Sequence, residues 1–364
     1  MRSRVDQRQA QVLALVQVRG SLRVTDLAAE LGVSPVTLRR DIEAMAARGE
    51  IRRLHGVISR VESRVEGRPA AAPAGRPAAA RRAEGLVVGM VAPTIEYYYA
   101  DVVRGAREAV EARGARLTVG LTGYLPGEDR TQADRLLSTG ADGLLLTPNW
   151  ESGSAAPGEG AWTAELPVPT VLVERSAPPG HPAAALDRVT SDHAQGAARA
   201  VQHLAGLGHR RIALASRETP TTARLRAGYE AAVGALGLAP APPWPPAGAA
   251  PLGAADRFAR TLAYLCAAVT EGGVTAALIH SDADAIMLIP QLQARGVRVP
   301  EDLAVVAYDD EVAGLADVPL SAVAPAKREV GARAAELLLD RLLHGDRSPG
   351  QHLELLPRLT IRSR

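Results

Sequence analysis

The sequence has one cysteine, Cys266, which excludes an internal disulfide framework and a zinc site built on several cysteines. Aromatic residues make up only 3% of the chain. There is no run of about 18 apolar residues and no apolar N-terminal signal-like segment, so we expect a soluble, cytoplasmic protein without a membrane span. One lysine accompanies 41 arginines, a bias typical of a GC-rich genome, and single arginines therefore do not indicate function by themselves.

The 364 residues, 47% of them apolar, are enough for two or three domains. The net charge of +2 hides an asymmetry. Residues 1–60 hold eleven Arg and six acidic residues, and residues 61–85 hold five Arg and three acidic residues, which leaves about −5 for the remainder. A basic N-terminal part on an acidic body predicts that only the N-terminal part meets a polyanion.

Residues 25–42 have the pattern of helix, tight turn and helix. Leu27 lies on the apolar face of the first helix, and Gly32 suits the sharp turn because it has no Cβ. Ser34 followed by Pro35 is typical of a helix start, with a hydroxyl cap and a residue whose φ is already set. The segment therefore predicts a helix-turn-helix.

The second helix has an apolar stripe of Leu38, Ile42 and Met45, which we expect to be buried. Its opposite face is small and basic, as a helix entering the DNA major groove requires. From this helix and its cap we predict five DNA contacts: Ser34, Val36, Thr37, Arg39 and Arg40.

A short hairpin is predicted over residues 50–58, after Gly49. It carries Arg52, Arg53 and His55, three more candidate DNA contacts. Two small helices alone could be a plain packing unit. A helix-turn-helix followed by a basic hairpin is a winged helix, and this combination favours DNA binding.

The pattern V-x-x-L-A-x-x-L-G-V-S-x-x-T-L-R-R-D, with a leading helix over residues 6–19 and R-x-H-G in the hairpin, resembles the N-terminal domain of DeoR-type regulators. The match covers about residues 4–60. The resemblance implies a winged helix-turn-helix DNA-binding domain at residues 1–60.

Residues 61–85 break the periodicity and form a flexible linker by composition. From residue 86 on, strand-like runs alternate with helical patterns, which predicts an α/β fold with a doubly wound parallel sheet. Strands are expected at 86–92, 116–121, 143–147, 170–173, 211–215, 276–280 and 303–307. Helices are expected at 100–113, 130–139, 195–207, 222–236, 255–271, 283–295 and 328–343.

Many short motifs of this part occur in one order and register: GMVAP at 89–93, PTVLVER at 169–175, VTSDHAQGAA at 189–198, LGHRRI at 207–212, RAGY at 226–229, VPEDLAVV at 299–306, YDD at 308–310 and PRLTIR at 357–362. They resemble the effector domain of the lactose-repressor family (LacI/GalR type). The resemblance implies a two-lobed, periplasmic-binding-protein-like sensor at residues 86–364. It implies lobe 1 at about 86–207 and 320–344, and lobe 2 at about 208–318 and 351–364.

Three departures from that family matter. Members usually carry Asp-Arg where this chain has Glu174-Arg175, and Asn-Asp where it has Ser281-Asp282. No hinge-helix pattern follows the N-terminal domain. The chain therefore looks like a fusion of one family's DNA reader with another family's sensor.

In an open α/β sheet the ligand binds outside the carboxyl ends of the strands. Tyr97, Tyr98 and Tyr99 follow the first strand, and flat rings suit a sugar or a nucleobase. The alternative is a helix start packed on the sheet. Arg175 ends its strand and could donate to hydroxyls, or pair with Glu174 as an ordinary salt bridge.

Asp282 and Asp309 end strands of the second lobe and could accept from ligand hydroxyls. For Asp282 the alternative is helix capping. Arg224 and Arg226 flank the place where the family has a ligand-facing arginine, and the sequence leaves open which of them faces the cleft. Asp282-x-Asp284 and Asp309-Asp310 could also form a carboxylate metal site, but Asp-rich strand ends are common and do not by themselves indicate a metal.

No catalytic motif, phosphate-binding loop or metal-ligand spacing is present, so we predict no enzyme, no metal and no cofactor. We predict a transcription regulator, a repressor, that binds an operator in double-stranded DNA as a homodimer. A small sugar-like or nucleoside effector is expected to control it. The alternatives are a transporter's solute-binding component and a sugar- or nucleoside-processing enzyme. The sequence does not identify the effector or the operator. It leaves open whether the effector is an inducer or a corepressor, and whether the protein represses or activates transcription.

Overall fold

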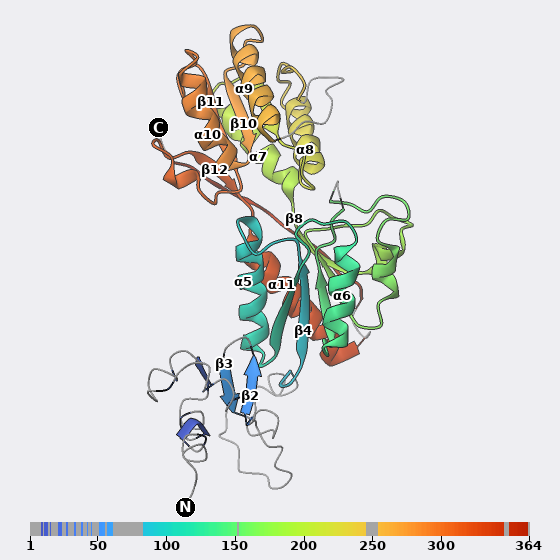
Figure 1. Cartoon of the computed structure of the whole chain (residues 1–364). Helices are drawn as coiled ribbons and strands as arrows, with labels where there is room; N and C mark the ends of the chain where they lie inside the picture. Colours follow the sequence, from blue (N-terminus) through green and yellow to red (C-terminus); the bar gives the residue numbers. More distant parts are fainter. Residues whose placement is uncertain are drawn as a thin grey trace, which may run out of the picture. The chain divides into compact units, whose positions relative to one another are not determined.

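The computed structural model describes residues 83–364, except 151–152, 245–253, 346–348 and 363–364. Before residue 83 it describes the backbone of three strands and a few core positions. The chain divides into two compact units, Met1–Ala74 and Gly75–Arg364 (Figure 1).

The first unit contains β1 (Ser21–Arg23), β2 (Ile51–Leu54) and β3 (Val57–Arg60), an antiparallel sheet of order β1-β3-β2. The β2–β3 hairpin confirms the predicted hairpin, whereas β1 was not predicted. The predicted apolar stripe is confirmed, since Leu38, Ile42 and Met45 are at most 1% exposed. They form a core cluster with Val12 and Leu27. Of the predicted DNA contacts, Ser34, Val36, Thr37, Arg39, Arg40 and His55 lie outside the described residues, and only the backbone is described at Arg52 and Arg53.

Lobe 1 of the second unit is built on a six-stranded, fully parallel sheet. Its strands, in spatial order, are β13 (His352–Leu355), β8 (Asp187–Ser191), β7 (Thr170–Val173), β6 (Gly143–Leu146), β4 (Val87–Ala92) and β5 (Arg116–Leu121). The helices α5 (Tyr98–Ala112) and α11 (Lys327–His344) pack into one core cluster with the sheet. The helix α6 (Glu128–Ser138) packs into a second cluster.

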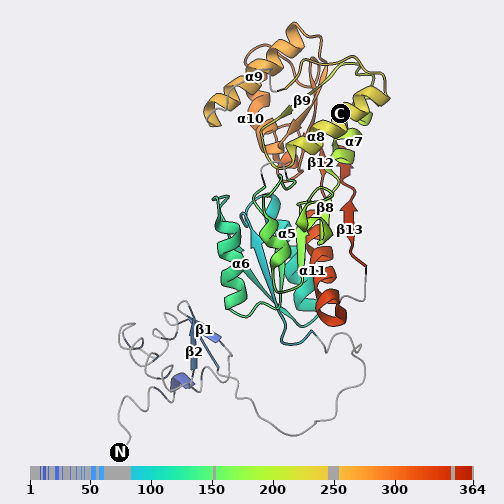
Figure 2. The same cartoon turned by 90° about the vertical axis from the view of Figure 1, so that its right-hand side faces the viewer.

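Lobe 2 is built on a five-stranded sheet whose edge strand β14 is antiparallel to β12. Its strands, in spatial order, are β14 (Arg358–Thr360), β12 (Ser321–Ala324), β11 (Ala304–Tyr308), β10 (Ala276–His280) and β9 (Ile212–Ser216). The helices α9 (Ala254–Thr270) and α10 (Asp282–Gln293) cover one face (Figure 2). The helices α7 (His193–Gly206) and α8 (Thr222–Ala235) cover the other face.

The seven strands and seven helices expected beyond residue 86 are all present, with ends within about two residues of the prediction. The strands β8, β12, β13 and β14 were not predicted. These four short segments contain polar or small residues and therefore lack the continuous apolar runs of the strands that were predicted.

The chain crosses between the lobes three times, from β8 to α7, from β12 to α11 and from β13 to β14. This differs from the lobe boundaries that the resemblance implied. The helix α7 packs on the lobe 2 sheet, β12 is a strand of lobe 2, and β13 is the edge strand of lobe 1. The difference arises because β8, β12 and β13 end at the cleft, where the chain passes into the other lobe.

The helices α5 and α11 cross at very short distance. A Cβ on Gly105 would lie 1.9 Å from the carbonyl oxygen of Arg328, and a Cβ on Gly331 would lie 1.9 Å from that of Val102. Only glycine permits this backbone approach. The close crossing brings the N-terminal end of α11 beside the tyrosines that open α5.

Candidate functional site

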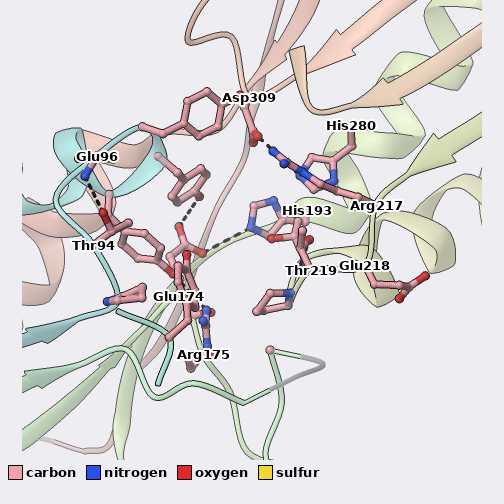
Figure 3. A pocket seen from close by; sticks show the side chains of 18 of the residues that line it. Thr94, Glu96, Glu174, Arg175, His193, Arg217, Glu218, Thr219, His280 and Asp309 are labelled. Atoms are coloured by element: carbon pink, nitrogen blue, oxygen red, sulfur yellow. Dashed lines mark hydrogen bonds and ion pairs between the residues drawn. The ribbon is translucent and has the colours of Figure 1, made fainter. Parts of the chain in front are cut away.

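A cavity of about 830 Å³ lies between the two lobes (Figure 3). Its walls come from the carboxyl ends of β4, β7, β9, β10 and β11 and from the starts of α5, α7 and α8. Parallel strands that end at one edge bring their following residues together, which is why the cavity forms there. Six of the eight predicted ligand residues line it: Tyr97, Tyr98, Tyr99, Arg175, Arg224 and Asp309.

The three tyrosines lie at the start of α5 and serve different purposes. Tyr97 has a left-handed backbone with φ of 49°. The rings of Tyr98 and Tyr99 meet edge to face, with centroids 5.5 Å apart. Burial, followed by the charge of Glu174, raises the pKa of Tyr98 well above its usual value. Tyr98 therefore stays a neutral donor, and its hydroxyl lies 2.7 Å from Glu174 Oε1.

Glu174 is a buried carboxylate that follows β7. It accepts from Tyr98, from the Ser191 backbone N–H at 3.0 Å and from the Ser191 hydroxyl at 2.8 Å. His193 Nε2 lies 3.5 Å from its Oε2. Burial alone would raise the pKa of Glu174, but His193, Ser191 and Tyr98 together lower it to about 2. Glu174 is therefore ionised. Its oxygens accept from Tyr98 and Ser191 of lobe 1 and lie beside His193 at the start of α7.

Arg175 is 3% exposed and is oriented by lobe 1 alone. Its Nε donates to the Pro148 carbonyl at 2.6 Å, and its Nη1 donates to Tyr99 Oη at 3.2 Å and to the Glu174 carbonyl at 2.9 Å. It makes no side-chain salt bridge with Glu174. Among the described residues none accepts from Nη2, so this nitrogen can donate to a molecule in the cavity.

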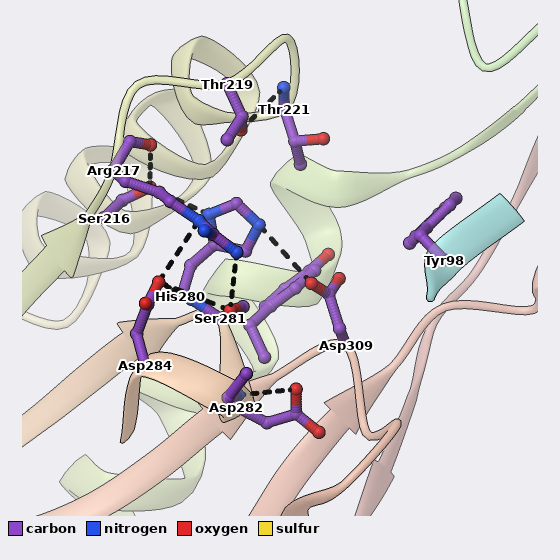
Figure 4. Close-up of polar contacts among 12 residues, drawn as sticks. Tyr98, Ser216, Arg217, Thr219, Thr221, His280, Ser281, Asp282, Asp284 and Asp309 are labelled. Carbon is purple, nitrogen blue, oxygen red and sulfur yellow. Dashed lines mark hydrogen bonds and ion pairs between the residues drawn. The ribbon is translucent and has the colours of Figure 1, made fainter. Parts of the chain in front are cut away.

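Asp309 brings a carboxylate of lobe 2 to the cavity. It is 4% exposed, and its backbone has φ of 94°. Its Oδ2 lies 3.5 Å from His280 Nε2 (Figure 4). Burial raises the pKa of Asp309 to about 6, although the charges of Lys327 and His193 oppose this shift. The carboxylate is thus poorly compensated and suited to accept from ligand hydroxyls.

His280 faces Asp309 as a neutral ring. Burial, and then the charges of His193 and Arg217, lower the pKa of His280 to about 3. Its Nδ1 lies 2.9 Å from the Ser216 hydroxyl. His280 adds hydrogen-bonding capacity to the cavity wall without adding charge.

Asp282, predicted to bind ligand, does not line the cavity. It is fully buried, and its Oδ1 accepts from the Ala283 N–H at 2.8 Å and from the Tyr97 hydroxyl. Its Oδ2 accepts from the N–H groups of Val312 at 2.6 Å and Ala313 at 2.9 Å. Both oxygens are occupied by protein donors, so the structure places Asp282 outside the cavity lining, where the prediction had it contact the ligand. The helix start itself is capped by the neighbouring Ser281 with Asp284.

The structure distinguishes the two arginines of α8. Arg224 lines the cavity, and its Nη2 lies 2.6 Å from the Ser176 hydroxyl of lobe 1. Arg226 does not line the cavity. Its side chain is 39% exposed and pairs at 3.5 Å with Glu218, which lines the cavity. The structure therefore places Arg224, and not Arg226, directly at the cavity wall.

Sequence reasoning missed several lining residues: Glu96, Tyr124, Glu174, His193, Arg217, Thr219 and His280. The eight histidines are scattered through the sequence without metal-ligand spacing, so their spacing does not single out His193 or His280. Their position at the end of a strand or the start of a helix could have indicated the site, since His280 ends β10 and His193 begins α7. Arg217 likewise follows β9 directly, and its Nε pairs with Asp284 at 3.2 Å.

Within the described part of the chain, no group of three or more His, Cys, Asp or Glu side chains could hold a metal ion. In the same residues, no helix combines the length and the apolar composition that a membrane crossing needs.

The fold and the cleft define a two-lobed, binding-protein-like domain, and comparison with known proteins agrees. Residues 8–64 match a DeoR-like helix-turn-helix domain, and residues 201–363 match a periplasmic binding protein-like domain. The chain is a transcriptional regulator that joins these two domains.

Curated relatives support this assignment. The chain is similar to the transcriptional repressor CytR of Escherichia coli K12, with 25% identity over 277 residues, 75% of this chain and 76% of CytR. It is similar to the repressor PurR of Haemophilus influenzae PittEE, with 27% identity over 284 residues, 76% of this chain and 80% of PurR. A LacI family regulator from Mycobacterium smegmatis has a TM-score of 0.60 and 27% identity, covering 76% of this chain and 97% of that one.

Proposed function

We propose that this regulator is a repressor controlled by a small sugar-like or nucleoside effector that binds in the cavity between the lobes. The observation that carries the proposal is the pairing, in one cavity, of tyrosine rings with oriented polar groups of both lobes. Arg175 offers donors from lobe 1, and Asp309 offers an acceptor from lobe 2.

This combination suits a polyhydroxylated ring. Rings such as Tyr97 can cover the apolar face of a sugar or base, and a charge-assisted acceptor such as Asp309 can bind two hydroxyls. Arg224 of lobe 2 bonds to Ser176 of lobe 1 at the same cavity. An effector that contacts both lobes would favour one arrangement of them over another.

The DNA-binding half of the proposal rests on the sequence of the first unit. Arg39 and Arg40 of the second helix and Arg52 of the hairpin would contact the operator. We propose a homodimer, because inverted half-sites need paired DNA-binding domains. A protein that acts on an operator would work in the cytoplasm, as a regulator and not as an enzyme.

Two experiments test the proposal. A thermal-shift screen of sugars and nucleosides should find a compound that raises the melting temperature of the full-length protein. Asp309→Ala and Arg175→Ala should each remove most of the affinity measured by calorimetry, while circular dichroism shows that both variants are folded.

The second experiment selects operators from a random-sequence duplex library with the full-length protein. Addition of the compound found in the screen should change the affinity for the selected duplex. If no duplex is enriched, or if no compound of either class binds, the proposed function is wrong.

A further inference from the structure

Lys327 is the one lysine among the 42 lysine and arginine residues of the chain. It opens α11 of lobe 1, and its side chain is only 7% exposed. At every other basic position the chain has arginine. This buried position alone carries a compact ammonium, which differs from a guanidinium in size and in the geometry of its donors.

The ammonium of Lys327 joins the two lobes. It donates to the backbone carbonyl of Asp309 and forms an ion pair with the carboxylate of Glu311, both on the loop that follows β11 of lobe 2. On its other side it lies above the ring of Tyr98, 5.4 Å from the centroid. The ammonium therefore has three partners, the carbonyl of Asp309, the carboxylate of Glu311 and the ring of Tyr98, and it has three N–H donors.

The loop of residues 309–313 needs such support. Asp309 and Asp310 both have left-handed backbone, with φ of 94° and 54°, which is unfavourable for residues with a Cβ and persists only where the surroundings hold it. Its far end is held by Asp282, which accepts from the N–H groups of Val312 and Ala313.

Lobe 1 reaches this loop twice. Lys327 binds it directly, and Tyr97 binds it through Asp282. The loop also carries the Asp309 carboxylate that faces the cavity. The position of that carboxylate is therefore tied to the arrangement of the two lobes.

We propose that Lys327 is a positioning residue, which fixes the loop of residues 309–313 to lobe 1 and thereby presents the Asp309 carboxylate to the effector. The proposal rests on the function proposed above. It concerns the unliganded protein, however, and can be tested without an effector.

The test compares amide hydrogen exchange in full-length wild type, Lys327→Met and Arg328→Met by mass spectrometry. Arg328 is the matched control, since it is the next residue but pairs with Glu108 of α5 within lobe 1 and is 54% exposed. Lys327→Met should speed exchange of the Val312 and Ala313 amides about tenfold. Arg328→Met should leave it unchanged, and peptides from β4 should be unchanged in both variants.

Glu311→Gln removes the other partner of the ion pair without disturbing α11, and it should produce the same faster exchange in the loop. This second variant keeps the test decisive if Lys327→Met does not fold. Exchange in Glu311→Gln that equals wild type, together with normal exchange in folded Lys327→Met, overturns the proposal.

A second measurement reads the influence of the Lys327 charge on Asp309 directly. In protein labelled with ¹³C at Asp carboxyls, the Asp309 signal, assigned by its loss in Asp309→Asn, should titrate near pH 6 in wild type. The charge of Lys327 lowers the pKa of Asp309, so the midpoint should rise in Lys327→Met and stay in place in Arg328→Met. A midpoint that does not move in Lys327→Met overturns the proposal. Failure of the effector screen would contradict the proposed function and leave these two results standing.

Discussion

The hydroxyl of Tyr97 in lobe 1 donates a hydrogen bond to the buried carboxylate of Asp282 in lobe 2. Both residues were expected to contact the ligand, and the structure pairs them with each other. The bond lies beside the cavity between the lobes, because Tyr97 also lines its wall. It therefore links the cavity to the contact between the lobes.

Tyr97→Phe should weaken effector affinity roughly tenfold, about 1.4 kcal/mol. The variant keeps the ring and removes only the bond between the lobes, while Asp282 retains its three backbone donors. Calorimetry with the compound from the screen measures the change. Tyr229→Phe is the control, since the Tyr229 hydroxyl bonds to the Ile212 carbonyl within lobe 2. Equal affinity of Tyr97→Phe and Tyr229→Phe would show that the bond has no part in binding.

Effector affinity should fall as the pH drops below about 6. Burial raises the pKa of Asp309 to about 6, and the protonated carboxyl loses one of its acceptors. Calorimetry between pH 5 and pH 8 checks this, and Asp309→Asn should bind weakly at every pH. A wild-type affinity that is flat across this range would place the acceptor elsewhere.

The same substitution should stabilise the unliganded protein at neutral pH. The folded-state pKa of Asp309 lies above its ordinary value of 3.8, so its contribution to stability is fully present below pH 3.8 and is lost as the pH rises through about 6. Relative to wild type, the unfolding free energy of Asp309→Asn should therefore gain on the order of 2 kcal/mol between pH 4 and pH 7. Denaturant melts measure it. Asp302→Asn, which lies outside the cavity and pairs with Arg298, should show no such gain over pH 5–7.

The two arginines of α8 offer a matched pair. Arg224→Ala should weaken effector binding at least tenfold, because its side chain lines the cavity and bonds across it to Ser176. Arg226→Ala should change affinity less than Arg224→Ala does, since Arg226 does not line the cavity and its pair with Glu218 is largely exposed. The reverse order of effects would mean that the cavity described here is not the effector site.

Arg40→Ala should weaken operator binding by about 1–3 kcal/mol if the side chain reaches a base edge or a phosphate. Arg52→Ala should weaken binding to all duplexes alike and reduce the salt dependence by about one unit for a lost phosphate contact. Fluorescence anisotropy at several salt concentrations measures both effects. Wild-type affinity in both variants would reject this assignment of the DNA-binding surface.

The segment between the domains should act as a tether, because Pro69, Pro73 and Pro77 oppose a continuous helix. A length-matched Gly/Ser replacement of residues 68–80 should keep most of the effector response. Operator affinity with and without effector is the measurement. Normal operator binding without any response would require an ordered linker that carries the signal.

The sequence alone was sufficient to predict the helices and strands that have a strong hydrophobic pattern. Each strand with a continuous apolar run was found, for example β10, which lies in the middle of its sheet. Short strands with polar residues were missed, both at a sheet edge, as β13, and inside a sheet, as β8 and β12. The reason is physical, since such a strand is defined by its pairing partner and not by its own pattern.

In the candidate site, too, some residues could be predicted from the sequence and others could not. Strand-end position was enough to bring Arg175 and Asp309 to the cavity wall. It was not enough for Asp282, whose role depends on three N–H groups from two separate segments. Which of Arg224 and Arg226 faces the cleft depended on the rotation of α8, which a single sequence does not define.

The order of the crossings has a consequence for synthesis. β13 supplies the edge strand of the lobe 1 sheet, and β14, two residues further on, supplies the edge strand of the lobe 2 sheet. A nascent chain that has not reached residue 352 therefore leaves both sheets with an unpaired edge. Neither lobe can be complete before the ribosome has synthesised these two strands. Proteolysis just before β13 would damage both lobes in a single cut.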